Sequence, residues 1–579
     1  MKKALVLILF IIIVASLFAG CDVIDKKLLN SKLPNGFHYE LNESGTEYTV
    51  TFIGKKTGAD VVIPEEHDGL PVTGIADCAF LGCRRMKSVT IPASITHIGS
   101  RAFFGCTRLK DVYISDLSAW CGVSLEYTWI SFESNPFAYA ENLYVNGELI
   151  TELVIPEDVE RINKAVFYRC PGITSVTIPS GVIGECAFTE CRSIKEINIG
   201  NGVSAIEIYA FENCTGLEKV YFNAVEMKDP VGLMNSLGVP LYNYIFANAG
   251  EKSGGFRVIV GKDATRIPDR LFSSTDAASV ISLEFEEGGV CKTIGHYAFE
   301  NCPELKSAHI PSHVSEIKSY AFSECKSLSE VTLSDGLYSL GYYAFLNCSS
   351  LTEIYIPNTI KMLFPSTFGG CTGLTKISVP ASVSTFNADI FEGCYNITEI
   401  SVDENNESFK SVDGNVYTKD GATLVKYAPG KTDAEFKVPE GVVTIGNYAF
   451  SGCRNLVSVT IPESVTSIGD YAFNDCAHLK RVNVGANVAK IDNYAFANCI
   501  CLTEINIPEG VTRIGNYAFR NCRKLKRIVI PESVAEMGAN AFLGCEKLTI
   551  RCGIGAKPES WDATWNPDDR RVVWGYTDK

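Results

Sequence analysis

One short phrase recurs along most of this 579-residue chain: alanine, phenylalanine, two variable residues and cysteine, with isoleucine and glycine ahead of it. A fixed short period is typical of a solenoid, in which each repeat buries its apolar face only against its neighbours. Such a chain displays a long surface and does not enclose one central pocket. The phenylalanines return every 23 residues in two series, Phe299, Phe322, Phe345, Phe368 and Phe391, then Phe450, Phe473, Phe496, Phe519 and Phe542.

A single repeat, residues 479–499, shows how the unit is built. Val482 and Val484 alternate with polar residues, which predicts a half-exposed strand. Val488 and Ile491 form a second short apolar pair, and Phe496 follows in a turn with helical or 3₁₀ character. The predicted fold class is therefore an α/β repeat solenoid with short parallel strands and a 23-residue period.

The chain holds 22 cysteines, which in an exported protein would first suggest disulfides. Fifteen of them follow a repeat phenylalanine by three residues, so they are expected to stack as a ladder of equivalent positions. Parallel Cβ vectors make disulfide geometry between neighbouring rungs poor, and no C-x-x-C pair is present to hold a metal. We expect reduced structural thiols, with disulfides as the alternative, at Cys302, Cys325, Cys348, Cys371, Cys394, Cys453, Cys476, Cys499, Cys522 and Cys545.

The first residues carry a separate signal. Lys2 and Lys3 precede an unbroken apolar run, residues 4–19, which is typical of a secretory signal peptide. The alternative, a transmembrane anchor, usually needs about 20 apolar residues. Cys21, directly after Phe-Ala-Gly, resembles the lipidated cysteine of a bacterial lipobox. That resemblance implies cleavage before Cys21, a lipid anchor at this residue and a place on the outer face of the cell membrane.

The charge balance restricts the possible partners. The chain carries 52 Lys and Arg against 67 Asp and Glu, a formal charge of -15. This balance argues against nucleic acid, since such binding depends on basic contacts to phosphate. No zinc-protease, nucleophile-elbow or phosphate-loop motif is present, and the carboxylates form no recurring pair. We therefore expect no enzymatic activity, no cofactor and no metal.

Spacing and composition divide the chain into segments. The repeats weaken at 223–298, and the residues at 403–435 contain paired Asp-Gly and Asn signals that indicate a hairpin. The predicted segments are a signal peptide at 1–20, a tether at 21–34, a β-hairpin cap at 35–60, repeats at 61–106, an aromatic-rich insertion merging into a repeat at 107–166, repeats at 167–402, the hairpin insertion at 403–435, repeats at 436–550 and a Trp-rich C-terminal cap at 551–579.

The repeat L-x-x-V-T-I-P-x-x-V-T-x-I-G-x-x-A-F-x-x-C closely resembles the BspA-type leucine-rich repeat, also called the TpLRR class. The resemblance covers nearly the whole chain after the tether, and it implies a surface or secreted protein of bacterial type. Several family members are similar in role to adhesins that bind host matrix proteins or other cells. The family provides no common set of binding residues.

Candidate ligand-binding residues lie where strands point outward. The outward positions flank the inward valines, and exposed faces of solenoid sheets commonly bind ligands. We predict Tyr113, Tyr221 and Tyr355 as anchors for an extracellular protein, although tyrosine also simply suits a strand. Trp120 and Trp129 in the insertion are the alternative, as rings that stack on a glycan. A structural surface-coat protein without a specific ligand is the third hypothesis for the function.

Overall fold

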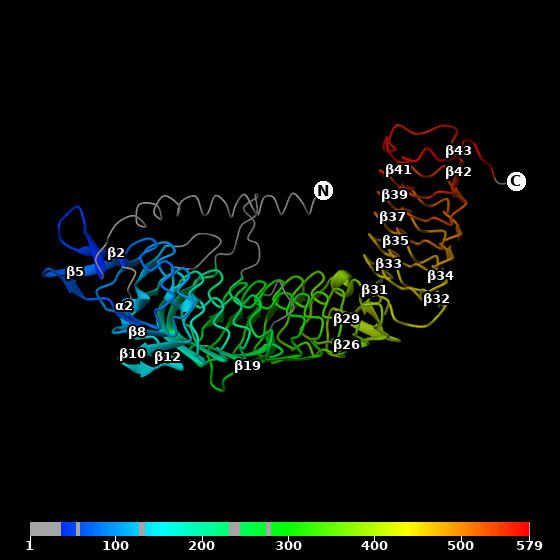
Figure 1. Cartoon of the computed structure of the whole chain (residues 1–579). Helices are drawn as coiled ribbons and strands as arrows, with labels where there is room; N and C mark the ends of the chain where they lie inside the picture. The colour runs from blue at the N-terminus through cyan, green and yellow to red at the C-terminus, as the bar shows by residue number, and fades with distance from the viewer. Residues whose placement is uncertain (1–35, 54–57, 127–133, 231–243, 274–279, 578–579) are drawn as a thin grey trace. The chain divides into compact units, whose positions relative to one another are not determined.

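The computed structural model describes residues 36–53, 58–126, 134–230, 244–273 and 280–577 (Figure 1). The predicted signal peptide, the tether and Cys21 lie outside these residues, as does Trp129. The chain divides into two compact units, Met1–Thr151 with Arg161–Ile173, and Glu152–Glu160 with Thr174–Lys579.

Most coils of the second unit contribute one longer and one very short strand. In β21 (Ser307–Ile310) the side chains alternate between half-exposed or exposed and buried, as the sequence pattern predicts. Pro311 then ends the strand, since proline has no backbone N–H to donate to a neighbouring strand. The two-residue strand β22 (Glu316–Ile317) follows and buries only its isoleucine. The stacked coils therefore build two parallel sheets.

The longer strands form the first sheet, in which successive coils pair in parallel. Its members run in several hydrogen-bonded segments. They are β12 (Glu152–Val154), β14 (Ser175–Ile183), β15 (Glu196–Ile206), β16 (Lys219–Phe222), β17 (Phe256–Val260), β19 (Val280–Phe285), β21 and β23 (Glu330–Leu333); β26 (Lys376–Val379) and β28 (Glu399–Val402); β32 (Glu435–Lys437), β34 (Ser458–Thr460), β36 (Arg481–Asn483) and β38 (Glu504–Ile505); and β40 (Arg527–Ile530), β42 (Thr549–Cys552) and β43 (Arg571–Val573).

The shorter strands form the second sheet. Here each coil adds only one or two ladder partners, such as Lys490 opposite Arg513. The members are β18 (Arg266–Ile267), β20 (Thr293–Ile294), β22 and β24 (Ser339–Leu340); β25 (Met362–Leu363) and β27 (Thr385–Phe386); and β31 (Thr423–Lys426), β33 (Thr444–Ile445), β35 (Ser467–Ile468), β37 (Lys490–Ile491), β39 (Arg513–Ile514) and β41 (Glu536–Met537).

A tight turn returns each coil from the second sheet to the first and places the repeat phenylalanine in the core. Two residues of this turn adopt a left-handed backbone, for example Tyr494 (φ 55°) and Asn498 (φ 60°). The left-handed region favours glycine and tolerates asparagine. This requirement explains why the residue before the cysteine is so often Gly or Asn. The phenylalanine rings stack face to face through successive coils, with centroids 4.6 Å apart for Phe450 and Phe473.

The first unit begins with an antiparallel pair, β1 (Phe37–Leu41) and β2 (Tyr48–Ile53), and β2 then pairs in parallel with β5 (Leu70–Ile75). The predicted insertion, 107–166, is also built into coils, since β10 pairs in parallel with β8. The remaining elements are β3 (Asp60–Val62), β4 (Glu66–His67), β6 (Ser88–Ile91), β7 (His97–Ile98), β8 (Asp111–Ile114), α2 (Leu117–Cys121), β9 (Ser124–Leu125), η1 (Pro136–Ala138), β10 (Asn142–Val145), β11 (Glu148–Leu149) and β13 (Arg161–Ile162).

In the second unit, the segment 403–435 forms an antiparallel meander. β29 (Phe409–Val412) pairs with β30 (Asn415–Thr418), and β30 pairs with β31, which begins the last run of the second sheet. The structure thus confirms the predicted solenoid with short parallel strands and a 23-residue repeat. Helix contributes little, since the described residues contain only α2 and the 3₁₀ turns η1 and η2 (Ala388–Phe391). None of the described helices is long and apolar enough to cross a membrane.

Candidate ligand-binding surface

The three predicted tyrosine anchors differ in their surroundings. Tyr113 lies on β8 of the first unit, Tyr221 on β16 of the longer-strand sheet, and Tyr355 between β23 and β26. The ring of Tyr113 stacks on Tyr144 of the next strand, with centroids 4.5 Å apart. The hydroxyl of Tyr221 donates a hydrogen bond of 2.9 Å to the Glu286 carboxylate. Burial, together with that hydrogen bond, raises the pKa of Tyr221 to about 12. Tyr113 and Tyr221 are therefore engaged with neighbouring coils.

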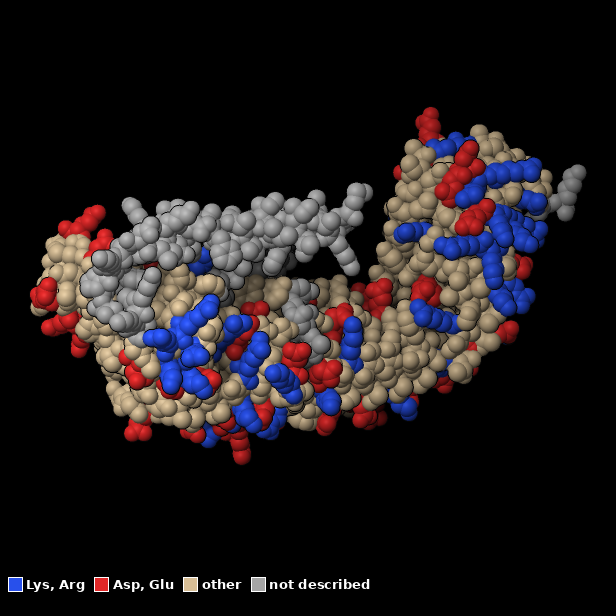
Figure 2. Space-filling model, in the orientation of Figure 1, with Lys and Arg blue, Asp and Glu red and all other residues tan. Residues whose placement is uncertain are grey.

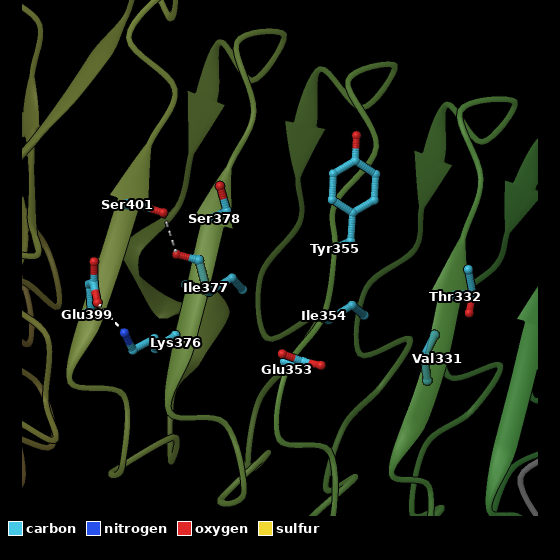
Figure 3. A pocket seen from close by; sticks show the side chains of 10 residues that line it. All are labelled: Val331, Thr332, Glu353, Ile354, Tyr355, Lys376, Ile377, Ser378, Glu399 and Ser401. Carbon is cyan, nitrogen blue, oxygen red and sulfur yellow. Dashed lines mark hydrogen bonds and ion pairs between the residues drawn. The ribbon is translucent and has the colours of Figure 1, made fainter.

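Tyr355 is different, because its side chain is 57% exposed and stands clear of the sheet (Figure 3). It lines a shallow groove of about 550 Å³ that crosses several coils of the sheet face. The other lining residues come from β23, the segment 353–354, β26 and β28. They are Val331, Thr332, Glu353, Ile354, Lys376, Ile377, Ser378, Glu399 and Ser401.

The groove coincides with an interruption of the sheet. The first hydrogen-bonded segment ends at β23, and the next begins at β26. Between them the outward alternation continues, yet Tyr355 forms only an isolated bridge with Ser378. The ladder pairing that aligns the outward side chains elsewhere in the sheet is thus absent in this coil. This interruption hollows the surface beside Tyr355.

The charged side chains of the groove lie away from the Tyr355 ring (Figure 3). The Nζ of Lys376 and the Oε2 of Glu399 form an exposed ion pair at 2.8 Å (Figure 3). The hydrogen bond from Lys376 lowers the pKa of Glu399 and, in return, raises that of Lys376. Among the described residues the exposed Glu353 carboxylate has no ion-pair partner. The groove thus offers one aromatic ring, one neutralised pair and one available carboxylate.

A second, smaller hollow of about 390 Å³ adjoins the groove, because Thr332 lines both. Its walls include Glu284, Phe285, His309 and Ser334. The Nδ1 of His309 lies 3.1 Å from the Thr332 hydroxyl, and its Nε2 lies 3.9 Å from Glu330. Together the two hollows form a depression that runs along the sheet face from β19 to β28.

The structure corrects the prediction for Trp120. This residue lies on α2, where its side chain is only 2% exposed and contacts the ring of Phe137. Trp120 is therefore a core residue and cannot present its ring to a glycan. The C-terminal tryptophans are also packed, since Trp561 and Trp565 join the core of the last coils. The packing of Trp561 and Trp565 agrees with the cap predicted at 551–579, whereas the sequence gives no sign that Trp120 is buried.

The ten ladder cysteines are buried in the turns as free thiols. In nine of them the Sγ donates to a phenylalanine carbonyl of the preceding coil at 2.9–3.3 Å, as Cys325 does to Phe299. Burial raises the pKa of Cys302 to about 12 and that of Cys325 well above its ordinary value. These thiols act as small apolar groups that also satisfy a buried carbonyl.

Between Cys394 and Cys453 the meander places a lysine in the core. The side chain of Lys426 is fully buried, and its Nζ donates to the Tyr448 carbonyl at 2.9 Å. Burial lowers the pKa of this amine. Across the described residues no group of three or more His, Cys, Asp or Glu side chains is arranged to hold a metal.

A second set of aligned tyrosines, absent from the predicted site residues, lies on the turns and not on the sheet. These residues precede the repeat phenylalanine by two positions, and their rings stack with centroids 4.6–4.8 Å apart. The signal was present as the recurring Tyr-Ala-Phe triplet. The two longest stacks are Tyr297, Tyr320 and Tyr343, then Tyr448, Tyr471, Tyr494 and Tyr517; Tyr209 and Tyr244 also stack, with centroids 5.4 Å apart.

One known protein family matches the chain. The family model of the BspA type leucine rich repeat region matches residues 59–125, 126–228, 292–415 and 432–549, in six copies. No curated protein matches the chain.

Several solved structures are similar to the chain. A leucine rich cell surface protein of Faecalibacterium prausnitzii is 22% identical, over 92% of this chain and 96% of that one, with a TM-score of 0.35. The pneumococcal vaccine antigen PcpA is 19% identical, over 66% and 94%, with a TM-score of 0.44. The leucine-rich repeat protein of T. pallidum is 23% identical, over 44% and 86%, with a TM-score of 0.22. Because the family model matches well over half of its residues, the chain belongs to the BspA-type leucine-rich repeat family.

Proposed function

We propose that this protein is a lipid-anchored, non-enzymatic recognition or adhesion protein of the bacterial surface. Its ligand is an extracellular protein that docks on the longer-strand sheet, with the groove beside Tyr355 at the centre of the contact. The observation that carries this proposal is the exposed ring of Tyr355 at the edge of a hollow in the sheet face. Aromatic side chains that border a pocket supply much of the energy at protein interfaces.

The residues around Tyr355 also indicate which ligand side chain suits the groove. A Lys or Arg of the ligand would find the Tyr355 ring face and the Glu353 carboxylate within the same hollow. A cation over an aromatic ring contributes about 0.5–1 kcal/mol at an exposed site and more when water is excluded. The Lys376–Glu399 pair leaves the adjoining wall neutral, so it does not repel such a cation.

The binding test uses a soluble form, residues 35–579, which keeps every residue that the structure describes. We would measure its binding to a panel of matrix proteins and polysaccharides at physiological salt. Tyr355→Ala is expected to weaken binding to a protein ligand about tenfold or more, as truncation of a central aromatic anchor does. Tyr338→Ala is the matched control, because Tyr338 is 62% exposed and lies outside both hollows.

Equal affinities of the two variants would exclude the groove as the centre of contact. Silence of the wild type on every protein of the panel would instead favour a surface-coat role without a specific ligand. Trp120 is buried, so it cannot support a glycan-binding role for the insertion.

The lipid anchor has its own test at Cys21. Cys21→Ser removes the thiol that accepts the lipid, and a single buried acyl chain already provides measurable membrane binding at about 0.8 kcal/mol per methylene. We expect the wild-type chain to incorporate labelled fatty acid and to sediment with membranes, and the variant to do neither. A variant that still takes up the label would show that the anchor is not at Cys21.

A further inference from the structure

The last hundred residues differ in charge from the rest of this acidic protein. Residues 480–579 carry 15 Lys and Arg against 11 Asp and Glu, whereas the whole chain carries 52 against 67. Figure 2 shows that the basic side chains gather on the side of the C-terminal coils where Figure 1 labels β34, β42 and β43. This side is the longer-strand sheet of the C-terminal coils.

Several of these cations line up in one column, by strand register within two hydrogen-bonded segments and by the 23-residue repeat from Glu504 to Arg527 between them. Arg481 of β36 pairs with Glu504 of β38, while Arg527 of β40 pairs with Thr549 of β42, which pairs in turn with Arg571 of β43. Neighbouring strands lie about 4.8 Å apart, so arginines two strands apart recur about every 10 Å along the column. Arg481, Arg527 and Arg571 are all exposed.

More basic residues border the column where each strand begins. Lys480 and Lys526 precede the two arginines directly, and Arg523, Lys524 and Lys547 lie on the adjoining turns; all five are exposed. Within the described part of the chain, neither Arg481, Arg527 nor their lysine neighbours form an ion pair. By contrast, Arg513 on the second sheet of the same coils pairs with Glu536 at 3.7 Å. The positive charge of the column is therefore not neutralised within the protein.

The shape of this face limits the class of ligand. The outward positions of β36, β38, β40 and β42 hold Arg481, Asn483, Glu504, Arg527, Val529, Thr549 and Arg551, with no aromatic residue among them. Beside these strands Tyr576 presents one half-exposed ring, and Arg551 covers it. Proteins that bind single-stranded nucleic acid stack successive bases on several aromatic side chains, which this face does not provide. Guanidinium groups suit sulfate and carboxylate groups through paired hydrogen bonds. A flat column of regularly spaced arginines fits an extended polymer that carries such groups along its length.

We propose that the sheet face of the C-terminal coils, centred on Arg481 and Arg527, is a second binding site whose ligand is a linear sulfated or carboxylated polysaccharide. The site relies on the export of the chain that the proposed function includes, but it shares no residue with the groove beside Tyr355. The ligand lies along the solenoid axis, and the arginine column and its lysine border contact successive anionic groups. Glu504, inside the column, opposes this binding.

The test compares two double variants that remove the same charge. Arg481→Gln with Arg527→Gln alters the column, and Lys490→Gln with Arg513→Gln alters the second sheet of neighbouring coils. The probes are heparin, polygalacturonate and neutral dextran, with the soluble form, residues 35–579. We expect the wild type to bind one or both anionic polymers but not dextran, with affinity that falls as salt rises. The column variant should lose about tenfold or more in affinity, and the control variant little.

A third variant separates this site from general charge attraction. Glu504→Gln removes the carboxylate between the two arginines, and it should raise affinity for the anionic polymer about threefold through loss of local repulsion. Equal losses in the two double variants, or no binding of either anionic polymer, would overturn the proposal. Binding of single-stranded DNA or of an acidic peptide as tight as that of the polysaccharides would also overturn it, as a site for another class of ligand. Unchanged polymer binding by Tyr355→Ala would separate this site from the groove.

Discussion

Two stretches of the same solenoid use one repeat in different ways: the groove coils, residues 280–402, and the regular coils, residues 436–552. In the regular coils the ring centroids of successive repeat phenylalanines lie 4.6, 4.9, 5.4 and 5.6 Å apart. In the groove coils the spacing widens toward the meander, from 5.3 Å at Phe322 and Phe345 to 6.2 Å at Phe368 and Phe391. Stacking is thus looser where the sheet face is hollowed.

The widening has a source in the sequence. In the coil of Phe368, Phe364-Pro365-Ser366 replaces the usual Gly-x-Tyr, so the tyrosine stack ends at Tyr343. In this coil the longer strand, around Tyr355, also loses its regular pairing. Intact repeats give a flat face whose ligand chemistry depends on charge alone. A coil that departs from the repeat gives a hollow with an exposed ring.

The largest expected effect is on local stability. Phe473→Ala should lower the free energy of local unfolding by about 3–5 kcal/mol, because it removes a fully buried ring stacked on both sides. Phe391→Ala should cost less, since Phe391 stacks on Phe368 at 6.2 Å and meets Phe386 only in a tilted contact at 6.0 Å. Hydrogen exchange followed by mass spectrometry measures the local stability of each stretch separately. Such a local measurement is needed because the repeats of a solenoid unfold nearly independently.

Equal losses of hydrogen-exchange protection in Phe473→Ala and Phe391→Ala would contradict the difference between the regular coils and the groove coils. They would show that the wider ring spacing of the groove coils has no energetic consequence. Exchange in coils remote from each substitution serves as the internal control, because repeat stability depends mainly on nearest neighbours.

The fold could be predicted from sequence because the 23-residue period alone dictates stacking of short parallel strands. The ligand-binding surface could be predicted only in part. The pattern placed Tyr113, Tyr221 and Tyr355 on outward positions, but it could not show that Tyr144 and Glu286 occupy the first two. Those partners come from other coils, and one of them lies 65 residues away. Only the packed coils reveal which tyrosine remains available.

Two further features depended on register, which a fixed period does not give. Thr352–Ile356 alternates like any other strand, so its sequence gives no sign that it fails to pair. The arginine column required knowing that Arg527 aligns with Thr549 and Arg571, at spacings of 22 residues and not 23. The prediction that Trp120 is exposed was wrong for a similar reason. An aromatic-rich insertion does not show which of its rings face the core, and on α2 Trp120 does so.

The smallest expected effect concerns the tyrosine stacks, and it tests whether they hold neighbouring coils together. Tyr494 stacks on Tyr471 and Tyr517 at 4.6 and 4.7 Å, whereas Tyr343 stacks only on Tyr320, at 4.7 Å. Asn is the suitable replacement, because Asn540 occupies the same turn position with φ of 55° and so adds no backbone strain. At about 0.5–1.5 kcal/mol per ring pair, Tyr494→Asn should cost about twice as much local stability as Tyr343→Asn. Hydrogen exchange in the adjoining turns measures both. If neither variant changes protection, the stacked rings do not stabilise the coils, and their half-exposed hydroxyl edges become the next candidates for contact with a ligand.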